Sequence, residues 1–212
     1  KIIEEGPWLS DEVREELGAK VVAGAEAVGY RGLATFEFLR DADGEFYFLE
    51  VNPRVQVEHT VTEMIAGVDL VSLGIRIAAG ESLPITQDEV SISGHAIQTR
   101  INAENPFTLE PSPGRIWECH WPGGPGVRVD THAHTGYDMP PSFDSLLAKV
   151  IVWAPTRNEA IAKMDSALAE TLIIGVDTLI PLHRAILNEI DFRNREVTIG
   201  YLDEHPGLLD GA

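Results

Sequence analysis

The stretch FEFLRDADGEFYFLEVNPRVQVEH, residues 36–59, carries the fold prediction for this 212-residue chain. Two runs rich in aromatic and β-branched residues flank the dipeptide Asp43-Gly44, which is typical of a tight hairpin turn. A two-residue turn there would place Glu37 directly opposite Glu50 on one face of the hairpin. The other face would carry Phe36, Phe38, Tyr47 and Leu49, and we expect it to be buried, because side chains alternate between the faces of a strand.

The facing carboxylates of Glu37 and Glu50 predict a metal site. Like charges directly opposite each other destabilise a sheet by about 0.2–1 kcal/mol, and a hard cation between them would turn repulsion into attraction. Mg²⁺ prefers oxygen ligands and takes one or two carboxylates, and Asn52 adds an oxygen one strand step beyond Glu50. The alternative is a solvated strand face in another register, because a one-residue slip separates the two acids.

The run after the hairpin places Arg54, Gln56 and Glu58 on the same side of an extended segment. At about 3.3 Å per residue, Arg54 and Glu58 lie roughly 13 Å apart, so they converge only if the chain bends. An arginine offers a bidentate fork to a small planar oxyanion, and a glutamate can remove its proton. An ordinary surface ion pair is the alternative.

The flanking segments complete an α+β pattern. A helix is predicted after Ser10, and Thr60–Glu63 is typical of a capping box that opens a second helix ending at Gly80. Short alternating strands follow the loop at residues 82–89, and two helices close the chain. This order predicts two subregions, with residues 82–89 as the candidate boundary.

Composition excludes several classes of protein. The formal charge is −18, which argues against nucleic acid and anionic membranes as partners. The single Cys119 rules out an intramolecular disulfide and suits a reducing compartment. The sequence contains no apolar run near the roughly 20 residues needed to span a bilayer. We therefore expect a cytoplasmic or organelle-matrix protein.

The run FEFL…EFYFLEVNPRVQVEHTVTEMIAGVDLV resembles the biotin carboxylase component of biotin-dependent carboxylases, a branch of the ATP-grasp superfamily. An acid two residues before Asn-Pro-Arg also fits carbamoyl-phosphate synthetases, but Gln56-Val57-Glu58-His59 is specific to the biotin branch. The resemblance continues through GHAIQTRINAEN (94–105), PSPGRI (111–116) and PPSFDSLLAKVIVW (140–153), and so covers essentially the whole chain.

The resemblance implies an α+β fold in two parts. Residues 1–86 would form the C-terminal half of an ATP-grasp module, and residues 87–212 the biotin carboxylase C-terminal domain, a mixed β-sheet with helices. In that family Mg-ATP activates bicarbonate as carboxyphosphate, which carboxylates biotin on a carrier and so feeds an acyl-CoA or pyruvate carboxylase. A preceding domain and a glycine-rich lid come before the position of Lys1, so an N-terminal half is expected to be missing.

The implied roles fall on individual residues. Glu58 would be the general base, Arg100 with Arg54 would stabilise the biotin enolate, and Mg²⁺ or Mn²⁺ would bind to Glu37, Glu50 and Asn52. The bicarbonate and biotin ligands would be Lys1, Arg54, Gln56, the backbone of Val57, Glu58 and Arg100. The ATP ligands would be Lys1, Leu39, Glu37, Glu50 and Ile199.

The implied partners are a biotin carboxyl carrier protein or domain, a carboxyltransferase subunit, the N-terminal half and a second copy of the chain. At the family's dimer contact Arg128 matches, whereas Pro125 replaces a residue that is usually aromatic. No biotin-attachment motif like MKM occurs, so the carrier lies elsewhere. The alternatives are a folded module without catalysis and a ligase of the carbamoyl-phosphate synthetase type.

Overall fold

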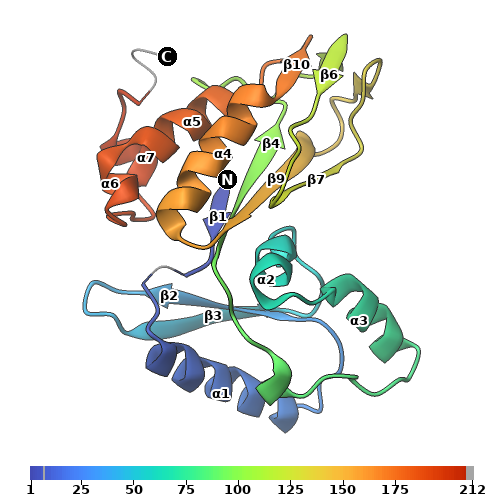
Figure 1. Cartoon of the computed structure of the whole chain (residues 1–212), viewed down its shortest axis with the longest axis vertical. Coiled ribbons are helices and arrows are strands. Elements are labelled where there is room, and N and C mark those ends of the chain that lie inside the picture. Colours follow the sequence, from blue (N-terminus) through green and yellow to red (C-terminus); the bar gives the residue numbers. More distant parts are fainter. Residues whose placement is uncertain (7, 209–212) are drawn as a thin grey trace. The chain divides into compact units, whose positions relative to one another are not determined.

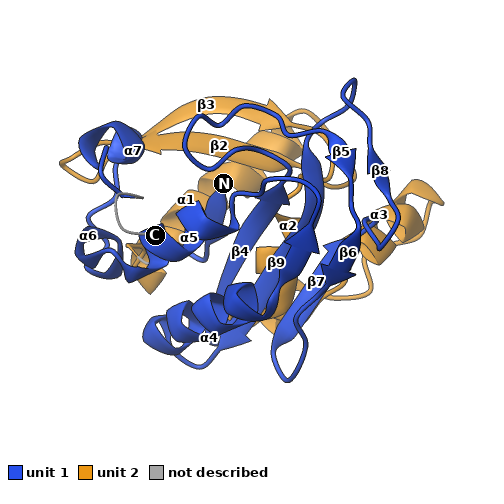
Figure 2. Cartoon of the chain, turned by 90° about the horizontal axis from the view of Figure 1, so that it is seen from above, with its two compact units in different colours: residues 1–7, 93–212 blue, residues 8–92 orange. Residues whose placement is uncertain are grey.

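The computed structural model describes residues 1–6 and 8–208, and the chain divides into two compact units (Figures 1 and 2). Unit 1 combines residues 1–7 with 93–212, and unit 2 consists of residues 8–92. Strand β1 (Ile2–Glu4) belongs to unit 1 because it pairs with β4 (His95–Asn102). The predicted boundary between residues 86 and 87 stays a prediction.

Unit 1 is built on a four-stranded sheet in the order β1-β4-β9-β7, in which β9 spans Leu146–Ala154 and β7 spans Val127–Thr131. Each neighbouring pair is antiparallel, so the expected mixed sheet is an antiparallel one, while the α+β class is confirmed. A parallel neighbour requires a crossover connection. The helix after β9 leads instead to β10 (Leu172–Ile174), which pairs with β6 (Glu118–His120) outside this sheet.

The helices of unit 1 supply most of its core. Helix α4 (Arg157–Glu170) has Thr156 as its N-cap, which forms a capping box with Glu159, and the helix lies against β4 and β9 (Figure 1). Its buried residues pack with those strands and with the next helix in one cluster. The remaining elements are β5 (Gly114–Arg115), β8 (Asp138–Met139), α5 (Ile180–Asn188), α6 (Ile190–Arg193) and α7 (Tyr201–Glu204).

Unit 2 begins with helix α1 (Asp11–Ala27) and the hairpin of β2 (Thr35–Arg40) and β3 (Phe46–Asn52). The oxygen of Ser10 accepts a hydrogen bond from the Val13 amide at 3.3 Å, so the predicted start of α1 is confirmed. The expected buried hairpin face is wrong, because none of residues 35–40 and 46–52, all described, is buried. No helix within the described residues is long and apolar enough to cross a membrane.

The single helix predicted from Thr60 to Gly80 is two helices, α2 (His59–Ala66) and α3 (Leu70–Ala78), followed by the short 3-10 helix η1 (Gln87–Glu89). Gly67 adopts a left-handed φ of 67° and ends α2, and Asp69 caps α3 by accepting from the Ser72 amide at 2.8 Å. The predicted capping box is wrong, because Thr60 lies inside α2. A glycine and an aspartate two residues apart are strong stop and start signals.

Candidate active site

The hairpin loop is one residue longer than predicted. The Asp41 amide donates to the Glu45 carbonyl at 3.0 Å, which leaves residues 42–44 as a three-residue loop. The Asp41 carboxylate accepts from the amides of Asp43 (3.0 Å) and Glu45 (2.9 Å), and Gly44 takes a φ of 93° that a residue with a side chain rarely adopts. These bonds favour the longer loop over the predicted two-residue turn.

A β-bulge then restores the predicted pairing of the two acids. Near the loop Phe38 pairs with Phe48, but one step further Glu37 pairs with Glu50, so Leu49 is an extra residue in β3. A bulge inserts one unpaired residue into one strand, and here it offsets the extra loop residue. The facing of Glu37 and Glu50 is therefore confirmed, although the two-residue turn from which it was predicted is wrong.

Amide groups surround the acidic pair. Asn52 donates through Nδ2 to Glu37 Oε1 and to Glu50 Oε1, both at 2.8 Å, and Gln56 Nε2 donates to Glu37 Oε1 at 2.9 Å. These N–H groups relieve the repulsion between the carboxylates. The donor set of two carboxylates and an amide fits a hard divalent cation, with the Asn52 amide turned so that its oxygen faces the ion.

The segment after Asn52 leaves the sheet. Strand β3 ends at Asn52, Pro53 cannot donate to a strand ladder, and the Arg54 amide donates back to the Asn52 carbonyl at 2.8 Å. The expectation of one extended polar face over residues 50–58 is therefore wrong beyond Asn52. The bend makes Glu58 the N-cap residue of α2, where the positive end of the helix dipole favours a negative charge.

Arg54 presents an exposed guanidinium with neutral partners. Its Nη1 donates to the Val55 carbonyl at 3.3 Å and its Nη2 to Asn52 Oδ1 at 3.5 Å. Both bonds are long, and in the part of the chain that the structure describes Arg54 forms no ion pair with a carboxylate. Its positive charge is therefore left for an anion.

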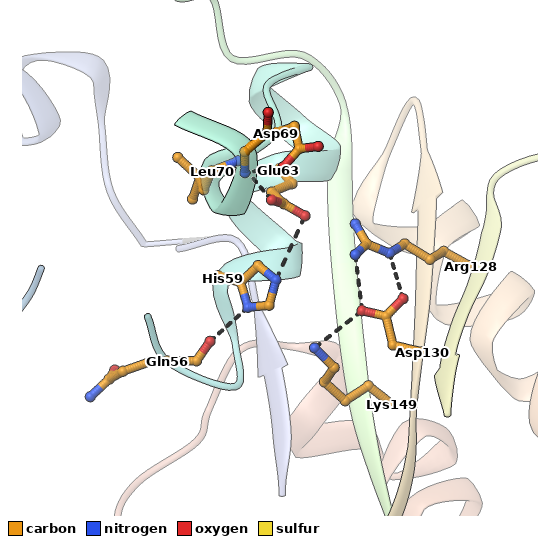
Figure 3. A network of polar contacts seen from close by, with 9 residues as sticks. Gln56, His59, Glu63, Asp69, Leu70, Arg128, Asp130 and Lys149 are labelled. Carbon is orange, nitrogen blue, oxygen red and sulfur yellow. Dashed lines mark hydrogen bonds and ion pairs between the residues drawn. The ribbon is translucent and has the colours of Figure 1, made fainter. Parts of the chain in front are cut away.

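A polar chain ties this segment to helices α2 and α3 (Figure 3). His59 Nδ1 lies 2.7 Å from the Gln56 carbonyl oxygen, and its Nε2 lies 3.8 Å from Glu63 Oε2. The other Glu63 oxygen accepts from the Leu70 amide at 2.7 Å. The sequence prediction missed this chain, although His59 and Glu63 stand at the helical spacing of i and i+4.

Lys1 and Arg100, which the prediction assigned to ligand binding, are neighbours within unit 1. The Arg100 amide donates to the Lys1 carbonyl at 3.0 Å, and Lys1 Nζ lies 2.7 Å from Glu104 Oε1. The Ser145 hydroxyl donates to the same Glu104 oxygen and accepts from Asn102 at 2.9 Å. Sequence reasoning missed Glu104 and Ser145, and the acid near the end of an apolar strand was the available signal for Glu104.

A second network in unit 1 involves Arg128, which the sequence resemblance assigns to a dimer contact (Figure 3). Arg128 holds Asp130 through Nε at 2.8 Å and Nη2 at 2.9 Å, and Lys149 Nζ lies 3.2 Å from Asp130. Burial acts to raise the pKa of Asp130, but hydrogen bonds from Arg128 and Lys149 outweigh it and hold the pKa below its usual range. The Arg128 side chain is thereby held in place.

The two predicted adenine-lining residues are apolar and exposed. Leu39 in β2 is 50% exposed, and Ile199 before α7 is fully exposed. Leu39 belongs to unit 2 with the acidic pair, whereas Ile199 belongs to unit 1 with Lys1 and Arg100. The structure brings together Glu37, Glu50, Asn52 and Gln56 in one unit, and Lys1 with Arg100 in the other.

Comparison with known protein families gives two matches that together cover most of the chain. Residues 98–204 match the family described as biotin carboxylase C-terminal domain. Residues 1–86 match the family described as carbamoyl-phosphate synthase L chain, ATP binding domain.

Individual relatives are similar over nearly all of this chain. The biotin carboxylase of Haemophilus influenzae is 48% identical over 210 residues, 98% of this chain and 47% of that protein. A pyruvate carboxylase subunit from Methanothermobacter thermautotrophicus is 49% identical over 213 residues, 99% of this chain and 43% of that protein. The chain therefore spans about half the length of the curated relatives it matches.

A solved structure extends the similarity to the fold. The biotin carboxylase domain dimer of the Hydrogenobacter thermophilus 2-oxoglutarate carboxylase, in complex with MgADP, ADP and bicarbonate, superposes with a TM-score of 0.97. It is 46% identical, and the match covers 100% of this chain and 47% of that one.

Proposed function

The chain belongs to the biotin carboxylase family, and on that premise we propose that it forms the C-terminal part of an ATP-dependent ligase that carboxylates biotin with bicarbonate. The observation that carries the proposal is the pairing of Glu37 with Glu50, surrounded by the amides of Asn52 and Gln56. Two facing carboxylates repel each other in a sheet, and a cation between them would turn that repulsion into attraction. The match of residues 98–204 favours this ligase over one of the carbamoyl-phosphate synthetase type.

The acidic pair is proposed to hold the divalent cation of the nucleotide. Glu37 and Glu50 would each supply a carboxylate oxygen and Asn52 an amide oxygen, to Mg²⁺ or Mn²⁺. The cation would neutralise negative charge on the phosphates of ATP. Leu39 and Ile199 would offer apolar surface to the adenine, and Lys1 would contact ATP or bicarbonate. Bound MgADP in the Hydrogenobacter relative supports this assignment.

The bend after Asn52 is proposed to hold bicarbonate. Arg54 would bind its oxygens through a bidentate fork, with Gln56 and the backbone of Val57 beside it, and Glu58 would take its proton. An oxygen of the deprotonated anion then forms a bond to the γ-phosphorus of ATP as the bond to ADP breaks, which produces carboxyphosphate. The phosphate that leaves carboxyphosphate would take the proton from the biotin nitrogen, and Arg100 with Arg54 would stabilise the resulting enolate, whose nitrogen accepts the carboxyl group.

The substrate that finally receives the carboxyl group is proposed to be selected outside this chain. The relatives include a biotin carboxylase, a 2-oxoglutarate carboxylase domain and a pyruvate carboxylase subunit, so this half occurs with different acceptors. Acyl-CoA or pyruvate would then be selected by a carboxyltransferase, with biotin delivered on a separate carrier. A homodimer is a further proposal, supported by the dimer of the Hydrogenobacter domain.

A chimera tests the proposal directly. This chain would replace the matching 210 residues of the Haemophilus biotin carboxylase, and ATP hydrolysis would be measured with and without bicarbonate and free biotin. We expect hydrolysis that depends on both. We also expect Glu58→Gln to reduce it about 10²–10⁴-fold, the usual contribution of a general base, with a normal melting temperature.

The matched control is Glu26→Gln, an exposed acid of α1 in the same unit, which should keep full activity. A folded chimera that hydrolyses no ATP would indicate the alternative of a module without catalysis. Full activity in the Glu58→Gln chimera would exclude Glu58 as the base.

A further inference from the structure

A second cluster of possible metal ligands lies in unit 1, far along the sequence from the acidic pair. Glu189 is the N-cap residue of α6, Asp191 lies inside that helix, and His205 follows α7. One ligand atom from each of the three residues lies within 4.8 Å of the others, and all three side chains are half-buried. We propose that Glu189, Asp191 and His205 bind a divalent transition metal such as Zn²⁺.

The His205 ring is oriented for this role. Its Nδ1 lies 2.8 Å from the Tyr201 carbonyl oxygen, and the ring stacks on the Tyr201 ring with centroids 4.3 Å apart. A carbonyl oxygen only accepts, so Nδ1 must carry the hydrogen. Metal-binding histidines commonly donate one ring N–H to a backbone carbonyl in this way, which fixes the ring and leaves the other nitrogen for the metal.

The remaining nitrogen faces an acceptor. His205 Nε2 lies 2.9 Å from Asp191 Oδ2. In the neutral ring with its hydrogen on Nδ1, the Nε2 lone pair would point at a carboxylate lone pair, which is repulsive. A cation must therefore sit between the two atoms, either a proton on Nε2 or a metal ion that both atoms coordinate.

Glu189 adds the third ligand at an accessible place. One of its oxygens, Oε2, accepts from the Ile190 amide at 2.8 Å, which leaves the other oxygen for a metal. A cavity of about 400 Å³ borders Glu189 and His205, with Ala185 and Asn188 in its lining. This space lets a metal ion enter and lets water complete its coordination.

The donor set distinguishes this cluster from the acidic pair in β2 and β3. An imidazole nitrogen with two carboxylate oxygens suits Zn²⁺ and related first-row metals, whereas the oxygen-only set of Glu37, Glu50 and Asn52 suits Mg²⁺. The two sets lie in different units and share no residue. The inference therefore stands independently of the proposed carboxylase chemistry.

Calorimetric titration of the metal-free chain with Zn²⁺ tests the site. We expect a Zn²⁺-binding event that His205→Asn weakens by at least the roughly 10–100-fold lost when a supporting residue of a metal site is removed. The control His134→Asn, which replaces an exposed histidine outside the cluster, should bind Zn²⁺ like the parent chain.

Imidazole ¹⁵N spectra of the parent chain give a second measurement that needs no variant. Zn²⁺ should shift the Nε2 resonance of His205 at one equivalent. Unchanged His205 resonances at saturating Zn²⁺, or equal Zn²⁺ affinity in His205→Asn, would overturn the site and leave a protonated His205 paired with Asp191.

Discussion

Glu37 and Glu50 face each other because two local features cancel, a loop that is one residue longer and a bulge at Leu49. The neighbouring side chains determine how far the repulsion between the two carboxylates destabilises the fold. Asn52 and Gln56 each offer an amide N–H to Glu37, and such bonds to a charged group contribute about 1.5–3 kcal/mol. These hydrogen bonds stabilise the acidic pair in the unliganded chain. A bound cation would replace them as the positive partner of the two carboxylates.

The first prediction concerns Glu50→Gln. We expect Mn²⁺ affinity, measured by calorimetry, to fall at least tenfold, because a metal site depends strongly on its carboxylates. The melting temperature should hold or rise, because the substitution removes a like-charge contact that costs about 0.2–1 kcal/mol. Glu45→Gln, an exposed acid beside the same loop, is the control and should change neither quantity.

A buried ionic cluster joins β1, β4 and α4 in unit 1. Glu4 accepts from Arg157 at 2.8 and 3.0 Å and lies 2.9 Å from His95 Nε2. Burial acts to lower the pKa of His95, but Glu4 and Glu5 outweigh it and raise the pKa above its usual value. Burial acts to raise the pKa of Glu4, but His95 and Arg157 outweigh it and lower the pKa.

These shifts predict a stability maximum between the two titrations. The stabilisation from His95 is complete below its unfolded pKa of about 6.5 and is lost as the pH rises through the raised folded pKa. The stabilisation from Glu4 is lost only as the pH falls through its lowered folded pKa. We expect the melting temperature to decline above neutral pH, and to decline less in His95→Gln. Parallel curves for the two proteins would contradict this, and His134→Gln should follow the parent.

At the scale of secondary structure, the break between α2 and α3 decides which group the Glu63 side chain contacts. Glu63 accepts from the first amide of α3, which a continuous helix would have bonded internally. Gly67 makes the break possible, since its left-handed conformation costs residues with a Cβ about 1–2 kcal/mol. The bend at Pro53 likewise ends β3, so that the polar residues after it lead into the N-terminus of α2 instead of continuing the strand.

Two glycine substitutions separate the effect of a left-handed backbone conformation from that of side-chain packing. A Cβ at Gly67 or at Gly18 in α1 would meet no atom within 4 Å, and only Gly67 has positive φ. Gly67→Ala should destabilise unit 2 by about 1–2 kcal/mol, whereas Gly18→Ala should stabilise it by about 0.5–1 kcal/mol. Urea unfolding followed by circular dichroism measures both, and a destabilising Gly18→Ala would show that helix propensity is not the controlling factor.

At the scale of the whole molecule, the two units differ in how much core each contains. In unit 1 the central strands β4 and β9 are almost wholly buried, with Ile97, Ile101 and Ile151 at 0% exposure. In unit 2 the hairpin has exposed apolar side chains, among them Tyr47 at 56% and Phe48 at 59%. Residues 47–51 of β3 are exposed in succession.

This difference predicts unequal hydrogen exchange. Local opening costs least where few apolar groups are buried, so the amides of β2 and β3 should exchange well before those of β4 and β9. Exchange followed by mass spectrometry on the 212-residue chain would measure it. Equal protection from hydrogen exchange in the two pairs of strands would contradict the prediction that unit 2 opens more easily than unit 1.

Local sequence signals determined the elements whose start and stop residues act within a few positions. Ser10 begins α1, Thr156 with Glu159 begins α4, and the alternating runs at residues 94–102 and 146–153 form β4 and β9. The α+β class followed from the same local patterns, whereas the facing of Glu37 with Glu50 was predicted from a two-residue turn that the structure does not have. These outcomes depend on backbone propensity and short-range hydrogen bonds, which a sequence encodes directly.

Only the tertiary structure decided the features that depend on long-range pairing. Residues 2–4 join unit 1 because β4 offers them a free edge, and no local pattern announces a partner so distant in sequence. The same holds for Lys1 with Glu104 and for His205 with Asp191. The bulge, too, emerged only from the paired strands, because register is a property of two strands together and neither strand alone specifies it.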